Sequence, residues 1–140
     1  MSDISIIERK MRLMAQASLG KYGIGFPEQL LIMYLNAHKE SNQTAIAEAL
    51  EIDKGSITKT LSKLEAKGLV SRAENPANRR EKNVVLTPAA GEILDAMHES
   101  YRKLNDILLG GLTDEQIAIT CESLSIIANN LVEATQDIRP

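Results

Sequence analysis

Residues 44–87 decide the fold, and they read "TAIAEALEIDKGSITKTLSKLEAKGLVSRAENPANRREKNVVLT". The alanine-rich residues 44–50 predict a short helix. The turn "EID" separates it from "KGSITKTLSKLEAK", residues 54–67, whose apolar residues recur at helical spacing. Two helices joined by a turn of about three residues predict a helix-turn-helix unit.

The ends of these helices carry residues that helix termini favour. Ser41 or Asn42 can cap the first helix, and Asp53 can cap the second. Gly68 is placed to adopt the left-handed conformation that closes the second helix. The predicted boundaries therefore rest on capping chemistry as well as on periodicity.

The second helix presents different chemistry on its two sides. Ile57, Leu61 and Leu64 fall at i, i+4 and i+7 and form the predicted buried stripe. The other side carries hydroxyls and lysines, with no acid before residue 65: Ser56, Thr58, Lys59, Thr60 and Lys63. Such side chains reach base edges and phosphates when the N-terminal half of a helix enters the major groove. The alternative is an ordinary helix that packs on its neighbour and exposes its lysines to solvent.

A hairpin is predicted directly after the helix-turn-helix. Residues 69–74 and 82–87 have the composition of strands, and the loop between them, residues 75–81, contains asparagine and proline as turn formers. A hairpin in this position is a wing. Arg79 and Arg80 lie at its tip, where long cations can enter the narrow minor groove of DNA.

The charge of the chain is unevenly distributed. Residues 53–82 hold eight basic and four acidic side chains, a local charge of +4, although the whole chain has a net charge of −3. The remainder therefore carries −7. A basic patch on an acidic body attracts a polyanion at one face, and nucleic acid is the leading candidate.

Further helices flank this segment. Apolar residues at helical spacing predict one helix over residues 3–19 and another from Pro27 to about His38. A third begins at Pro88, with Thr87 as its cap.

The last helix begins at the capping-box pattern formed by Thr113 and Gln116. The apolar stripes of the terminal helices exceed what one small winged module can cover, so we expect them to bury one another across the two-fold axis of a homodimer; the alternative is an intramolecular bundle.

The chain is predicted to be mainly α with a small β-hairpin wing (α+β). In this scheme residues 1–26 and 88–140 form a helical dimerisation region, and residues 27–87 form the winged helix-turn-helix.

Residues that could carry other chemistry are few. His38, His98 and Cys121 lack the spacing of a metal site, and no catalytic or phosphate-loop motif occurs, so no enzyme, metal or cofactor is predicted. Cys121 lies on the apolar face of its helix, which favours an inert buried thiol. The longest apolar run, "LLIMYL" at residues 30–35, is too short to cross a bilayer, so we expect a cytoplasmic protein and no membrane partner.

The sequence resembles the MarR family of bacterial transcription regulators. The resemblance is carried by "LEAKGLVSR", "NPANRR" and "VVLTPAAGEIL", and by "YGIGFPEQLLIMYL" before the module. It implies a homodimer that binds a pseudo-palindromic operator on double-stranded DNA. Members of this family often repress their own operon and often release DNA on binding a small phenolic or other lipophilic effector, and the resemblance implies the same for this chain.

Site residues follow from the resemblance position by position. It implies DNA contacts for Ser56, Thr58, Lys59, Thr60 and Lys63. Arg80 matches the wing arginine that enters the minor groove, and Arg79 is its neighbour. Lys54, Arg72 and Asn78 complete the predicted DNA-binding set.

Two departures from the family pattern affect these positions. Members commonly have aspartate where this chain has Asn75 and Asn78. Asn78 can hydrogen-bond to a guanidinium group, but without the ionic component, so the wing tip becomes more positive. Lys59 stands where arginine is frequent, and lysine lacks the bidentate geometry of arginine.

One face of the helix that begins at Pro27 indicates an effector pocket. Leu30, Tyr34 and His38 share one helix face at i, i+4 and i+8, and Met11 and Met14 could supply an adaptable opposing wall. A stripe of this kind also suits an ordinary core. Two functions remain: a dimeric, ligand-responsive DNA-binding repressor, or a winged-helix dimer that acts as a protein-interaction module without specific DNA binding.

Overall fold

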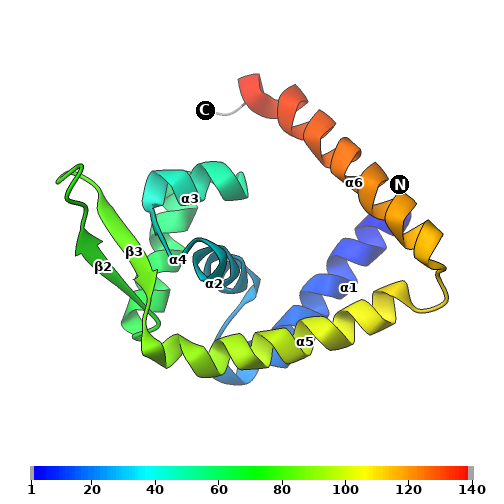
Figure 1. Cartoon of the computed structure of the whole chain (residues 1–140), viewed down its shortest axis with the longest axis horizontal. Helices are drawn as coiled ribbons and strands as arrows, with labels where there is room; N and C mark the ends of the chain where they lie inside the picture. The colour runs from blue at the N-terminus through cyan, green and yellow to red at the C-terminus, as the bar shows by residue number, and fades with distance from the viewer. Residues whose placement is uncertain (1, 139–140) are drawn as a thin grey trace. The chain divides into compact units, whose positions relative to one another are not determined.

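The structure, a computed structural model, describes residues 2–138 and has the predicted fold class, mainly α-helical with a small antiparallel sheet (Figure 1). The winged helix-turn-helix consists of α2 (Phe26–His38), β1 (Glu40–Asn42), α3 (Gln43–Leu50), α4 (Lys54–Ala66), β2 (Val70–Glu74) and β3 (Lys82–Leu86). The predicted wing is confirmed: the β2–β3 hairpin packs on the helices, and its tip projects beyond them.

Helical segments precede and follow this module in the sequence. Before it come α1 (Ser2–Leu19) and η1 (Gly20–Tyr22); after it come η2 (Pro88–Ala90), α5 (Gly91–Leu109), α6 (Asp114–Thr135) and η3 (Gln136–Ile138). Contacts among the described residues divide the chain between residues 102 and 103, within α5. None of the helices between residues 2 and 138 is both long and apolar enough to span a membrane.

The strand β1 was not predicted. The sequence "KESN" reads as a connection between helices, yet Ser41 pairs with Val84 and the sheet order is β1-β3-β2. Glu, Ser and Asn have no strong preference for strands, so the strand exists because β3 offers a free edge about 40 residues later in the chain. As a result, β3 is held by hydrogen bonds on both of its edges.

The predicted helix caps are confirmed in the winged helix-turn-helix. Asn42 accepts a 2.7 Å hydrogen bond from the Ala45 N–H at the start of α3. Asp53 accepts one of 2.8 Å from the Ser56 N–H at the start of α4. Gly68, which follows α4, has φ +70°, the left-handed conformation that its position requires.

The core joins α2 and α4 to the wing. The predicted stripe of Ile57, Leu61 and Leu64 is confirmed, with exposures of 1% or less. It packs in one cluster with residues from the neighbouring elements, including Leu31, Ile32, Leu35, Ile46, Val70 and Val84. Burial of each such aliphatic side chain contributes about 1.5–3 kcal/mol to stability, and together these side chains fix α4 against α2.

The placement of Thr60 on the exposed side of α4 was wrong. Thr60 is only 8% exposed, and its hydroxyl donates a 2.9 Å hydrogen bond to the Ser56 carbonyl one turn earlier. The buried stripe is wider than the spacing of its aliphatic residues indicates, because a threonine can enter a core once its hydroxyl has a backbone partner.

A polar contact ties α2 to α1. Gln29 is 2% exposed, and its Nε2 donates a 2.9 Å hydrogen bond to the main-chain carbonyl of Ala15 in α1. Gln29 is therefore satisfied inside the core, as a buried amide must be.

The flanking helices differ in one respect from expectation. The Thr87 hydroxyl does not cap the following helix; it donates instead to the Gly68 carbonyl, and the chain enters α5 through η2. The capping box of Thr113 and Gln116 is confirmed at the start of α6, with hydrogen bonds of 3.0 and 3.2 Å. None of the described residues of α6 is buried.

Candidate nucleic-acid interface

The N-terminal turn of α4 is fixed by short hydrogen bonds. The Ser56 hydroxyl donates to Asp53 at 2.6 Å, and the Thr58 hydroxyl donates to the Lys54 carbonyl at 2.8 Å. The hydrogen bond from the Ser56 hydroxyl, and after it the one from the Ser56 N–H, lowers the pKa of the Asp53 carboxyl below its ordinary value of 3.8. Asp53 therefore stays ionised near neutral pH and holds the start of the helix.

Gln43 joins α3 to the same turn. Its Nε2 donates to the Thr58 hydroxyl and also approaches the Lys54 carbonyl at 3.3 Å. The two helices of the helix-turn-helix are thus linked at the end where Lys54, Ser56 and Thr58 are exposed. A ligand that meets this end encounters hydroxyls and one cation on a fixed frame.

The wing tip is built from two asparagine turns. Asn75 accepts a 3.0 Å hydrogen bond from the Ala77 N–H, and Asn78 accepts one of 3.1 Å from the Arg80 N–H. Asn78 is able to hydrogen-bond to a guanidinium group, but in the structure its amide oxygen accepts from the backbone N–H of Arg80. Asparagine can therefore order the chain under Arg80 without a carboxylate.

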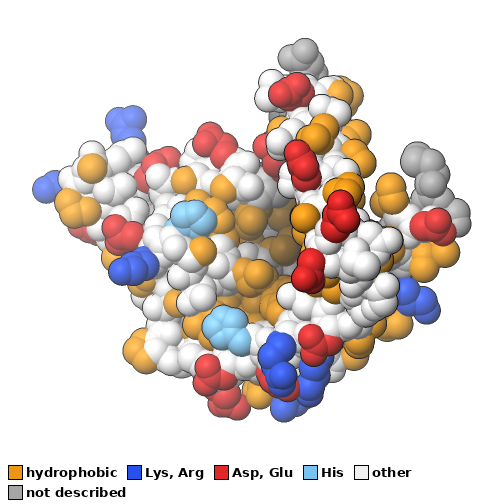
Figure 2. Space-filling view, turned by 45° about the vertical axis from the view of Figure 1, so that its right-hand side comes forward, with side chains coloured by type: hydrophobic (Ala, Val, Ile, Leu, Met, Phe, Trp, Pro, Cys, Tyr) orange, Lys and Arg blue, Asp and Glu red, His pale blue; other side chains and the backbone are white. Residues whose placement is uncertain are grey.

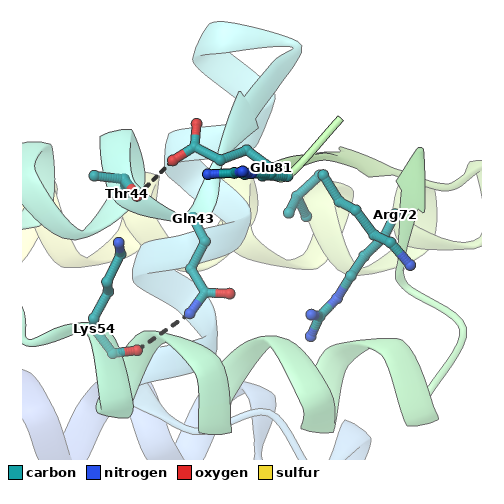
Figure 3. A pocket seen from close by; sticks show the side chains of 8 residues that line it. Gln43, Thr44, Lys54, Arg72 and Glu81 are labelled. Atoms are coloured by element: carbon teal, nitrogen blue, oxygen red, sulfur yellow. Dashed lines mark hydrogen bonds between the residues drawn. The ribbon is translucent and has the colours of Figure 1, made fainter. Parts of the chain in front are cut away.

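A groove lies between α3, α4 and the wing (Figure 3). Its volume is about 460 Å³, and it is lined by Gln43, Thr44, Lys54, Arg72, Arg80, Glu81, Lys82 and Val84. Four cations therefore face one acid in a space bounded by the helix-turn-helix and the hairpin. Glu81, the acid, accepts a 3.1 Å hydrogen bond from the Thr44 hydroxyl, which joins the wing to α3.

The structure brings together only some of the predicted DNA-binding residues in this groove: Lys54, Arg72 and Arg80. Another group lines a hollow of about 350 Å³ over α2 and α4: Ser56, Lys59, Thr60 and Lys63. Arg79 and Asn78 are exposed at the wing tip.

Two of the predicted DNA-binding cations already have acidic partners. Arg72, whose side chain is 25% exposed, lies with its Nε 3.3 Å from an Oε atom of Glu65. Lys63 lies with its Nζ 3.6 Å from an Oε atom of Glu28. These pairs tie α4 to β2 and to α2.

Sequence reasoning missed several residues of the groove: Gln43, Thr44, Glu81 and Lys82. Lys82 contributes to the local charge that the sequence displays, and Gln43 and Thr44 directly follow the cap Asn42. Helix N-termini are common sites of contact with phosphates, so that position was the available signal. Nothing in the sequence indicates that Glu81 would reach across to α3.

The five residues of the predicted effector region are only partly brought together. The rings of Tyr34 and His38 stack with centroids 4.1 Å apart, and the Tyr34 hydroxyl lies 3.5 Å from that of Ser41. Leu30 is half-buried on the same helix. On α1, Met11 is half-buried and Met14 is exposed.

The expectation of a buried thiol was wrong, because Cys121 is exposed on α6. Between residues 2 and 138 no group of three or more His, Cys, Asp or Glu side chains is placed to hold a metal ion.

The chain is similar in sequence and in structure to known proteins. Residues 27–82 match the profile of the MarR family. A MarR transcriptional regulator from Methanosarcina mazei Go1 has a similar structure, with 26% identity, a TM-score of 0.85, and coverage of 95% of this chain and 96% of that chain. The likeness therefore extends well beyond the matched domain.

Two further structures were solved with DNA. The E. coli MarR variant complexed with operator DNA is 22% identical, with a TM-score of 0.80 and coverage of 89% of each chain. The S. aureus MepR–DNA complex is 23% identical, with a TM-score of 0.84 and coverage of 91% of this chain and 93% of that chain. At this level of identity the two likenesses show a shared fold.

Proposed function

Residues 27–82 form a MarR-family domain, and from that premise we propose that the chain is a sequence-specific DNA-binding transcription regulator. It acts as a homodimer on a pseudo-palindromic operator and represses transcription by occupying it. A small lipophilic or phenolic effector releases it.

The groove between α3, α4 and the wing is the observation that carries this proposal. Lys54, Arg72, Arg80 and Lys82 come from different elements and face one space with a single acid, Glu81. A polyanion that passes through this space meets the N-terminal end of α4 and the wing together (Figure 3). Lys54, Arg80 and Lys82 gain free energy by displacing counterions from DNA phosphates, whereas Arg72 is already paired with Glu65.

The homodimer is supported by the apolar residues of α1 and α6. Leu124 and Leu131 on α6 are 55% and 61% exposed, and Ile4 and Ile7 on α1 are also exposed. Figure 2 shows hydrophobic side chains interspersed with acidic ones along α6. A second copy of the chain would cover these side chains, and a two-fold dimer carries one α4 helix for each half-site of a pseudo-palindromic operator.

The effector is supported by the stacked rings of Tyr34 and His38 on α2. Both lie on the helix that follows α1 and packs against α4, and the Tyr34 hydroxyl is within reach of Ser41 in β1. A ligand that displaced either ring would act on the frame that carries α4.

A mobility-shift titration tests the regulator directly. The purified protein is titrated against DNA from upstream of its own gene and against a scrambled duplex of equal length, at about physiological salt. We expect a discrete complex that survives scrambled competitor. Equal binding to both duplexes, followed by failure to enrich any sequence from a genome-wide DNA selection, would exclude a sequence-specific regulator and favour a protein-interaction module.

A further inference from the structure

Glu28 is a buried carboxylate in the first turn of α2. Glu28 as a whole is 5% exposed, and its two carboxylate oxygens have different partners. One accepts a 3.1 Å hydrogen bond from the Gly25 N–H at the start of the helix, and the other lies 3.6 Å from the Nζ of Lys63 on α4. A single side chain therefore joins the start of α2 to α4.

The pairing matters because the two partners differ in exposure. The Lys63 side chain is 56% exposed, whereas that of Glu28 is 7% exposed. A buried carboxylate needs a counter-charge and hydrogen-bond donors, since burial otherwise disfavours its charged form. Glu28 thus places an acidic partner beside the ammonium group of Lys63, on a helix side that carries candidate DNA contacts.

Lys59 provides the comparison within the same helix. It lies one turn before Lys63, is exposed, and lines the same hollow over α2 and α4. The two lysines share one chemistry and one helix face, but Lys63 is held by a buried acid. They should therefore behave differently toward a phosphate backbone.

We propose that Glu28 is a specificity-determining positioning residue, which withholds Lys63 from DNA phosphates and so lowers affinity for non-specific DNA. The inference rests on the proposed DNA-binding function. A cation that stays paired with a carboxylate displaces no counterion from DNA, so it adds nothing to the salt-dependent, sequence-independent part of binding. Removing the Glu28 charge releases Lys63 to the backbone of any duplex.

Glu28→Gln isolates this effect. Glutamine retains an oxygen that can accept the Gly25 N–H, as in capping boxes generally, while the negative charge is lost. Affinity for a scrambled duplex is measured between about 50 and 200 mM salt for the wild type, E28Q, K63Q, the double variant E28Q/K63Q and the control K59Q. Thermal unfolding of each variant by circular dichroism establishes that it is folded.

The expected outcomes separate the two lysines. E28Q should bind the scrambled duplex several-fold more tightly, with a log–log salt slope steeper by about 0.9, and K63Q should keep the wild-type slope. The double variant should return to that slope, because it lacks the released lysine. K59Q should become shallower by about 0.9, which shows that loss of one contacting lysine is detectable.

A shallower slope for K63Q, or an unchanged slope for a folded E28Q, would overturn the proposal. If E28Q does not fold, the comparison of K63Q with K59Q decides, since equal losses for the two lysines would mean that Lys63 contacts phosphate in the wild type. Failure of the proposed function looks different. A wild type that binds operator and scrambled DNA equally would lose its role as a specific regulator, while the slopes would still test Glu28. A wild type that binds neither duplex overturns both.

Discussion

The Thr44 hydroxyl donates a 3.1 Å hydrogen bond to the Glu81 carboxylate, across 37 residues of sequence. Thr44 lies in the first turn of α3, and Glu81 immediately follows Arg80 in the wing. The contact therefore sets the wing against the helix-turn-helix beside the arginine that is proposed to enter the minor groove.

Thr44→Val should weaken operator binding several-fold, because the wing loses its tether to α3 while the core stays intact. Thr44→Ser keeps the hydroxyl and is the matched control. Fluorescence anisotropy with operator DNA measures binding, and thermal unfolding should show a stability loss of about 1 kcal/mol or less. Equal operator affinities for the two variants would show that this hydrogen bond does not orient the wing.

Arg80→Ala should cost roughly 1–3 kcal/mol of operator binding, mainly through loss of the wing contact. Arg79→Ala should cost less, because Arg80 lines the groove and Arg79 does not. The two arginines are adjacent and exposed, so they form a matched pair for titration at fixed salt. The assignment would be reversed if Arg79→Ala were the more damaging substitution.

Leu124→Asp combined with Leu131→Asp should convert a dimer to monomers, because both leucines are exposed on α6 seven residues apart and charges there oppose burial. Asn129→Asp combined with Asn130→Asp adds the same charge at exposed polar positions and should leave the dimer intact. Sedimentation velocity reports the mass of each variant. A wild type that is already monomeric at micromolar concentration would contradict the proposed assembly.

Asp53 should make the stability of the chain depend on acidic pH. Hydrogen bonds from Ser56 lower the pKa of Asp53 in the folded chain below its ordinary 3.8. The added stability is therefore present above pH 3.8 and is lost as the pH falls through the lower folded-state pKa. Asp53→Asn keeps a capping oxygen without the charge. The melting temperature of the wild type should exceed that of D53N near neutral pH, and this difference should disappear below about pH 3.8. A difference in melting temperature that does not change with pH would mean that the charge of Asp53 contributes nothing to stability.

Tyr34→Ala and His38→Ala should alter the release of DNA by a ligand and leave ligand-free operator affinity nearly unchanged, since neither side chain lines the groove. A panel of monocyclic phenols serves as the probe in a DNA-release assay. Wild type and variants are compared at equal operator occupancy. Parallel losses in ligand-free binding and in release would place these residues in the scaffold rather than in an effector site.

Local chemistry explains which features could be predicted. The caps Asn42, Asp53 and Thr113 and the left-handed Gly68 act within four residues of the groups they satisfy, so their roles can be read directly from the sequence. The stripe of Ile57, Leu61 and Leu64 follows from helical spacing alone, which requires no knowledge of the partner.

The features that escaped prediction depend on partners distant in sequence. The strand β1 forms only because β3 lies beside it, and the Glu81 carboxylate finds Thr44 across the groove. The buried position of Thr60 depends on how α4 packs, and the acidic partner of Lys63 comes from α2. Periodicity cannot encode such pairings, because it describes one element at a time.

The hydrogen bond from Gln29 to α1 sets an asymmetry in substitutional tolerance. Its acceptor is the main-chain carbonyl of Ala15, which every residue type at position 15 would also provide. Its donor is a side-chain amide buried to 2% exposure. Sequence drift at position 15 can therefore proceed without breaking the link, whereas position 29 admits few residues that could keep it.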